Sequence, residues 1–234
     1  DIAPTLPEGQ LALGYALFAG KLDIAGAREA YDAAYRYGQG NADILQFYAI
    51  YAVRARLFAK AQSAIERALA LDPLNPRAWR SAGSIDLASG RPEQAITRYD
   101  RALALNPKMS NARALKGYAL IGLGRWQDAK VALDSETSSM FRLTGLAILG
   151  SKTGDRKLAE RSFAELVKEH GDAALYQQAQ VLAQWGRPDD AMRCLVRARE
   201  VGDSGMVALV TDPFLAPLAN DSRFRTIARQ IGFS

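Results

Sequence analysis

Apolar residues recur at helical spacing through most of the chain, and the pattern of apolar, small and polar positions itself repeats. The segment RALALDP at residues 67–73 returns as RALALNP at residues 101–107, an offset of 34 residues. The same offset relates Gly83 to Gly117. A fixed period of this length indicates an array of similar units, in which each unit buries its apolar face against the next one.

The unit at residues 76–109 shows how this pattern produces two helices. Apolar and small residues at helical spacing predict a first helix over residues 77–89: Trp79, Ala82, Gly83 and Leu87. Gly90 is expected to end this helix, because glycine tolerates the left-handed conformation of a helix C-cap. Pro92 is suited to the first turn of a second helix, and Pro107 stops that helix.

The unit resembles the tetratricopeptide repeat (TPR), a 34-residue motif made of two helices. Seven signature positions are matched, by Trp79, Gly83, Gly90, Ala95, Tyr99, Ala102 and Pro107. Ala82 stands where the family usually has Leu and Asp86 where it usually has Tyr, so a thinner contact between the helices is expected there. The resemblance covers nearly the whole chain. It implies an all-α fold, a right-handed superhelical α-solenoid of about six TPR-like helix pairs with a C-terminal capping helix.

The units differ in how closely they follow the motif, which suggests a division of the chain. The predicted pairs are residues 8–38, 42–75, 76–109, 110–139, 140–171 and 172–203. The fourth pair loses its final turn and its proline at residues 135–139. We therefore expect an N-terminal array over residues 1–139 and two further pairs over residues 140–203. Limited proteolysis is expected to cut first between Asp134 and Met140. Residues 204–234 depart from the repeat and are expected to cap the array, because a solenoid must cover its terminal apolar face. This tail resembles those that end TPR regions appended to bacterial regulators and sensor proteins.

Composition and charge exclude several kinds of site. Cys194 is the only cysteine and His170 the only histidine, which excludes the usual zinc cages. The net charge is +5, and its excess falls on residues 79–156, with 12 basic and 7 acidic residues. This excess could attract an acidic partner, but a mildly basic solvated face is the simpler explanation. The basic residues are spread over second helices and turns, whereas nucleic acid requires clustered cations, so nucleic-acid binding is not favoured.

The TPR resemblance also implies a binding surface. In TPR arrays the first helices of the pairs line a concave groove, and the corresponding positions here are Tyr15, Phe18, Gln46, Phe47, Ile50, Arg54, Arg77, Arg80, Ser84, Leu87, Asn111, Tyr118, Tyr176 and Gln180. Aromatic and arginine side chains anchor extended peptides well, because they bury a large area with few rotors to immobilise. The competing interpretation is that Phe18 and Phe47 belong to the core and that the arginines face solvent.

A carboxylate clamp of the kind found in some TPR co-chaperones is not predicted. Its five positions are occupied here by Leu11, Tyr15, Phe47, Arg77 and Ser81, of which one agrees in charge. Any peptide binding is therefore expected to depend on aromatic and arginine side chains. An extended, partly acidic segment would then bind in the groove around five of these residues: Phe47, Arg54, Arg77, Arg80 and Tyr118.

The sequence therefore predicts a non-enzymatic protein- or peptide-binding module, with no cofactor and no metal. We expect it to be the interaction or sensor part of a larger bacterial regulator or assembly protein. Two alternatives stay open: a scaffold that self-associates or spaces other domains, and a sensor domain that binds a small ligand. The chain begins at Asp1 without Met and is read as a processed chain or an excised fragment, in the cytoplasm or the periplasm. No apolar run has the ~20 residues that a membrane-spanning helix requires.

Overall fold

The computed structural model describes residues 6–233, and within this range it contains thirteen α-helices and no β-strand. Twelve of the helices form six consecutive pairs: α1 (Pro7–Tyr15) with α2 (Ala27–Tyr37), α3 (Ala42–Arg54) with α4 (Phe58–Leu71), α5 (Pro76–Ala88) with α6 (Pro92–Leu105), α7 (Ala112–Gly122) with α8 (Trp126–Asp134), α9 (Ser139–Thr153) with α10 (Arg156–His170), and α11 (Leu175–Gln184) with α12 (Pro188–Glu200). The predicted all-α solenoid of six helix pairs is confirmed.

The predicted start and stop signals explain where these helices begin and end. The Asn75 side chain accepts hydrogen bonds from the backbone N–H groups of Arg77 and Ala78, which caps α5. Gly90 follows that helix with a φ of +74°, a conformation that glycine adopts without steric cost. Pro92 then occupies the first turn of α6. These signals lie within one repeat, which is why the sequence alone could place them.

Small residues allow the two helices of a pair to approach closely. A Cβ atom added to Gly83 of α5 would lie 2.6 Å from Cε1 of Tyr99 on α6. The Tyr99 ring is fully buried against this glycine, and Ala95 and Ala102 of α6 are fully buried as well. A larger side chain at residue 83 would therefore force the tyrosine or the helix to move.

The segment between α8 and α9 is held by one buried carboxylate. Glu136 is 4% exposed, and its carboxylate oxygens accept hydrogen bonds from the backbone N–H groups of Asn111, Ala114 and Ser138 at 3.2, 3.1 and 2.9 Å. The segment at residues 135–139, where the repeat loses its final turn, is thus bound to the start of α7. No pattern in the sequence indicated this contact, and the division of the chain at residue 139 stays a prediction.

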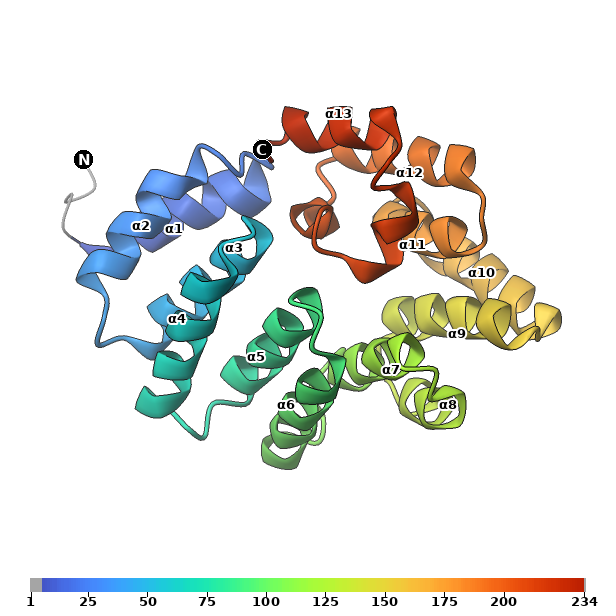
Figure 1. The fold of residues 1–234 in the computed structure, drawn as a ribbon, viewed down its shortest axis with the longest axis horizontal. Coiled ribbons are helices and arrows are strands. Elements are labelled where there is room, and N and C mark those ends of the chain that lie inside the picture. The colour runs from blue at the N-terminus through green and yellow to red at the C-terminus, as the bar shows by residue number, and fades with distance from the viewer. Residues whose placement is uncertain (1–5, 234) are drawn as a thin grey trace.

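The six pairs follow one another around an arc, and the C-terminal segment turns back on the inside of it before its last helix crosses the top of the view towards the first pair (Figure 1). This segment consists of two 3-10 helices, η3 (Ser204–Ala208) and η4 (Pro213–Leu218), followed by α13 (Ser222–Gln230). It packs mainly on α11, and it also contacts the π-helical turn η1 (Ala16–Gly20) that ends α1. The first and last parts of the chain therefore meet, and the solenoid is closed into a ring.

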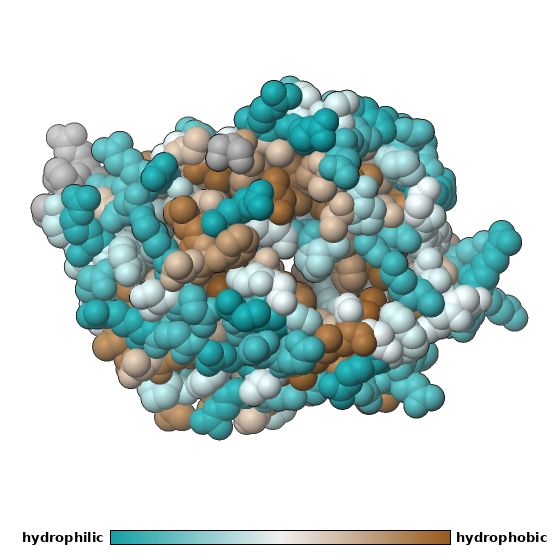
Figure 2. Space-filling view, in the orientation of Figure 1, coloured by the Kyte–Doolittle hydropathy of each residue, from teal (hydrophilic) through white to brown (hydrophobic). Residues whose placement is uncertain are grey.

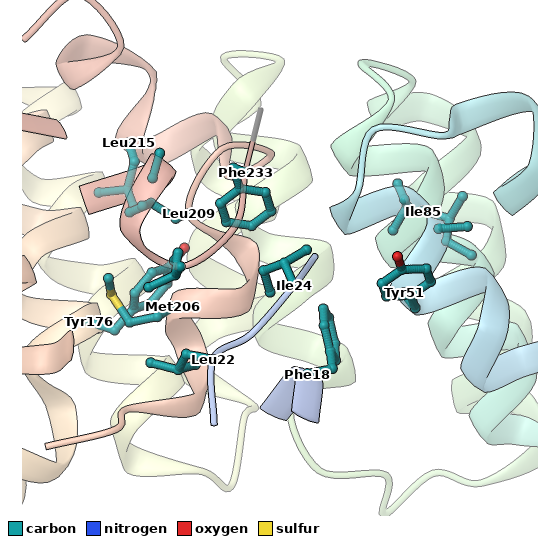
Figure 3. Close-up of a cluster of buried hydrophobic side chains, with 14 of the residues drawn as sticks. Phe18, Leu22, Ile24, Tyr51, Ile85, Tyr176, Met206, Leu209, Leu215 and Phe233 are labelled. Atoms are coloured by element: carbon teal, nitrogen blue, oxygen red, sulfur yellow. The ribbon is translucent and has the colours of Figure 1, made fainter. Parts of the chain in front are cut away.

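The largest hydrophobic cluster lies at this closure. Phe18, Leu22 and Ile24 from the first pair share one buried cluster with Met206 and Phe233 from the C-terminal segment (Figure 3). Burial of apolar area is the main source of stability in a folded chain. The C-terminal segment is therefore a structural part of both ends of the array, beyond the expected cover for its last pair.

Candidate functional site

Eight of the predicted groove positions lie on the first helices of the pairs and fall into two groups. The first group is covered by the C-terminal segment and consists of Arg54, Tyr118, Tyr176 and Gln180. The second group remains accessible and consists of Tyr15, Phe47 and Arg77, with Arg80 half-buried beside them. In the space-filling view, hydrophobic side chains are visible at the middle of the ring, whereas its outer edge is mainly hydrophilic (Figure 2).

Asp212 is the centre of the covered half. Its Oδ2 atom accepts hydrogen bonds from the Tyr176 hydroxyl at 2.8 Å and from the Gln180 side-chain amide at 2.6 Å. Its Oδ1 atom accepts from the backbone N–H of Phe214 at 2.9 Å. Tyr176 and Gln180 are both nearly fully buried, so these bonds to a carboxylate are shielded from water. The groove therefore binds an acidic side chain of its own chain.

The residues on either side of Asp212 are held by the same surface. The Arg54 guanidinium donates from Nη1 to the Thr211 hydroxyl at 2.9 Å, while its Nε is buried without a hydrogen-bond partner. The Phe214 ring packs edge-on against Tyr118, with 5.1 Å between ring centroids. Gln184, which the groove pattern did not include, donates to the Phe214 carbonyl at 2.8 Å. These contacts hold three kinds of group in succession, a hydroxyl, a carboxylate and a phenyl ring.

Burial shifts the pKa values of several side chains along this surface. Burial, followed by the nearby Asp212 carboxylate, raises the pKa of the Tyr176 phenol well above its usual value. Burial also raises the pKa of Tyr118. Burial lowers the pKa of the Arg80 guanidinium, and repulsion from Arg77 acts in the same direction. The two arginines are thus close enough to repel each other.

The accessible half has the aromatic and cationic groups that the sequence predicted. Tyr15 of α1 and Phe47 of α3 pack edge-on, with 6.1 Å between ring centroids, and they are 53% and 38% exposed. Arg77 and Arg80 follow on α5. Within residues 6–233 neither guanidinium forms an ion pair. An acidic ligand would therefore find two uncompensated cations on α5 and two exposed rings on α1 and α3.

Comparison with known families identifies the repeats. Residues 49–85 and residues 86–135 match two family models, each described as tetratricopeptide repeat. Residues 49–135 are TPR repeats. No curated protein matches it in sequence.

Solved TPR structures share this fold at low sequence identity. A TPR protein from Thermus thermophilus superposes with a TM-score of 0.66 at 18% identity, covering 76% of this chain and 98% of that one. PilW, described as a type IV pilus biogenesis factor, has a TM-score of 0.63 at 16% identity and covers 96% and 99%. The pilF protein of Pseudomonas aeruginosa has a TM-score of 0.58 at 18% identity and covers 83% and 91%.

The remaining TPR groove positions have mainly structural contacts. Phe18 is 3% exposed and packs against Tyr31 and Tyr51, so it belongs to the core and is not part of an open groove. Ile50 packs against the same cluster. The half-buried Leu87 borders the cavity between the groove and the C-terminal segment.

Three polar TPR positions are engaged within the array. The Gln46 amide donates to the Ser81 hydroxyl at 3.1 Å, and Ser84 donates to the Arg80 carbonyl at 3.2 Å. Asn111 has a φ of +62° at the start of α7, and its backbone N–H is bound by Glu136. Gln46 and Asn111 therefore join different segments of the array, whereas the Ser84 bond lies within α5.

The single histidine and the single cysteine have surroundings that do not match the usual nucleophile–base arrangements. His170 lies 2.9 Å from the Ser139 hydroxyl through Nε2, and the Glu169 carboxylate approaches the same nitrogen at 3.7 Å. A triad needs an acid on the other nitrogen to orient the imidazole. Burial raises the pKa of the Cys194 thiol, which disfavours the thiolate.

The part of the chain that the structure describes contains neither a metal-binding cluster nor a membrane-spanning helix. Residues 6–233 bring no three His, Cys, Asp or Glu side chains together as a metal site would require. In the same range, no helix has both the length and the apolar character that crossing a bilayer demands.

Proposed function

We propose that this protein is a non-catalytic binding module whose concave surface takes an extended, partly acidic segment of another protein. The observation that carries the proposal is the binding of Asp212 by Tyr176 and Gln180. Side chains at groove positions here hold an acidic residue that is followed by proline and phenylalanine. The segment is part of the same chain, but the chemistry of its recognition is that of an acidic, aromatic peptide.

The accessible half of the groove offers the same chemistry to a partner. Tyr15 and Phe47 supply rigid apolar area, and Arg77 and Arg80 supply charge that no carboxylate of residues 6–233 neutralises. Charge complementarity of this kind mainly sets specificity and the rate of association. The exposed rings supply the buried area that gives affinity.

The wider context is part of the same proposal. We place the module in a larger bacterial regulator or assembly protein. One of the proteins of the same fold is described as a type IV pilus biogenesis factor, which is the role of an assembly protein. The closed ring favours a recognition role over a filament-forming scaffold, because the first and last pairs are covered by one another and by the C-terminal segment.

Fluorescence anisotropy with labelled peptides that alternate Asp or Glu with Phe or Leu tests the proposal. The double variant Arg77→Ala/Arg80→Ala should bind the best peptide severalfold more weakly than the unmodified chain, and added salt should weaken binding further. The matched control is Arg36→Ala/Arg161→Ala, which removes the same charge from exposed positions on α2 and α10. Equal affinity for all three proteins would overturn the assignment of the groove.

A further inference from the structure

A second cavity, of about 700 Å³, lies at the seam of the ring. It is bounded on one side by the turns after α3 and α5 and on the other by η4 and α13. Its apolar wall is contributed by both sides: Phe58, Leu87, Leu209, Leu215, Phe224 and Phe233. Small residues such as Ala216 and Ala228 leave the space between these side chains open. A volume of this size with a mainly apolar lining is typical of small-molecule sites.

Three arginines line the same cavity. Arg56 belongs to the turn after α3, where it has a φ of +61°, and Arg225 and Arg229 lie one helical turn apart on α13. Within residues 6–233, Arg225 donates to the Asn220 carbonyl at 2.8 Å and Arg229 to the Thr226 hydroxyl at 3.5 Å, and none of the three arginines forms an ion pair. Like charges at this helical spacing repel each other.

Among the described residues that line the cavity, Asp212 is the one carboxylate, and it is already engaged. Its oxygens accept hydrogen bonds from Tyr176, Gln180 and the backbone of Phe214. The cavity thus combines an apolar interior with an excess of positive charge. Arginine is well suited to bind a carboxylate ligand here, because its planar guanidinium holds a carboxylate through two parallel hydrogen bonds.

We propose that this seam cavity binds a small amphiphilic carboxylate, an apolar chain or ring system that ends in one carboxyl group. The apolar body would lie against Leu209, Phe224 and Phe233, with the carboxylate at Arg225 and Arg229. A cavity of this volume holds a single chain of a fatty-acid kind, whereas an extended peptide requires a track over several repeats. This site is separate from the accessible half of the groove and does not depend on the function proposed for it.

Occupation of the cavity would also stabilise the closed ring. Such a ligand touches the turns of the N-terminal half and α13 of the C-terminal segment at once. A ligand that binds only the folded state raises the apparent stability of that state. Dodecanoate should therefore raise the melting temperature of the chain, and dodecanol, which has the same apolar chain without the charge, should raise it less.

Isothermal titration calorimetry with dodecanoate and dodecanol tests the proposal directly. The unmodified chain should bind dodecanoate at least severalfold more tightly than dodecanol. Arg225→Gln/Arg229→Gln should abolish this preference while keeping dodecanol binding, and Arg36→Gln/Arg161→Gln is the matched control. Ala216→Phe, which fills the cavity from an exposed position, should weaken the binding of both dodecanoate and dodecanol without removing a charge.

Several results would overturn the proposal. Equal affinity for dodecanoate and dodecanol, no binding of either, or an unchanged preference in the Arg225/Arg229 variant would each do so. Displacement of dodecanoate by the acidic peptides of the groove assay would assign the cavity to a peptide instead. The outcome for the groove proposal can be told apart from the outcome for this cavity, because Arg77→Ala/Arg80→Ala should leave dodecanoate binding unchanged.

Discussion

The backbone amide of Ile24 donates a hydrogen bond of 3.0 Å to the carbonyl oxygen of Ile231, which joins the first helix pair to the end of α13. A Cβ atom on the neighbouring Gly232 would lie 2.7 Å from the backbone nitrogen of Ala25, so the two segments are in direct contact. The bond lies beside the hydrophobic cluster that both ends of the chain share (Figure 3). An array whose repeats normally contact only their neighbours thereby acquires a contact between its first and last elements.

Truncation of Phe233 tests how much this closure contributes to stability. The side chain is 7% exposed, and Phe233→Ala should lower the free energy of unfolding by about 3 kcal/mol, because burial is lost and a cavity remains. Val201→Ala, at a position that is 46% exposed, is the control and should change stability by less than about 0.5 kcal/mol. Urea denaturation gives both values. Hydrogen exchange at the Ile24 amide should accelerate in the first variant alone, and similar losses in both variants would contradict the closure.

Replacement of Asp212 tests the covered half of the groove. Asp212→Asn places an amide opposite the Tyr176 and Gln180 donors, so it should cost about 1–3 kcal/mol of stability. Combined with Tyr176→Phe, the two changes should be non-additive by about 0.5–3 kcal/mol, since they remove the same bond. Asp134→Asn, which affects one exposed ion pair with Lys130, is the control. Additive losses at Asp212 and Tyr176 would show that the hydrogen bond contributes nothing measurable.

Glu136 is expected to hold the link between α8 and α9. Glu136→Gln keeps the shape but leaves one of the three backbone donors facing an amide nitrogen, so it should cost about 1–3 kcal/mol. Limited proteolysis between Asp134 and Met140 should become faster in this variant than in the unmodified chain. Glu165→Gln on the exposed face of α10 should change neither stability nor cleavage. Unchanged cleavage in Glu136→Gln would mean that the carboxylate does not secure this link.

Alkaline pH should unfold the chain through its buried tyrosines. Burial raises the pKa of six of the nine tyrosines: Tyr31, Tyr48, Tyr51, Tyr99, Tyr118 and Tyr176. For Tyr51 and Tyr99 the folded-state pKa rises from 10.0 to about 12. The unfolded chain ionises first, so this stability is fully present below pH 10 and is lost as pH rises towards the folded values.

Tyrosinate absorbance and circular dichroism, followed together through an alkaline titration, check this expectation. Ionisation of the six buried phenols should coincide with loss of helical signal. Tyr99→Phe should make the loss of stability with pH less steep, whereas Tyr37→Phe, at a position 49% exposed, should not. Ionisation of all nine phenols with the helices intact would contradict the prediction.

Local signals made the helix pairs predictable from the sequence. Gly90, Pro92 and the small residue at Gly83 act within one 34-residue unit, and each unit needs only its neighbour to bury its apolar face. The same reasoning placed Tyr15, Phe47 and Arg77 on an accessible surface. It could not separate them from Phe18, because an aromatic residue on an amphipathic helix suits a core and a groove equally well.

The repeat, the six helix pairs and the type of residue that lines the inside of the array all follow from local patterns in the amino-acid sequence. The position of the C-terminal segment on that inside surface, with Asp212 bound by Tyr176 and Gln180, emerges only in the folded chain. The physical reason is that the curvature of a solenoid accumulates from small rotations between repeats, and no local pattern encodes their sum. The contacts of Arg54 with Thr211 and of Ile24 with Ile231 exist only because the accumulated curvature brings the two ends of the chain together.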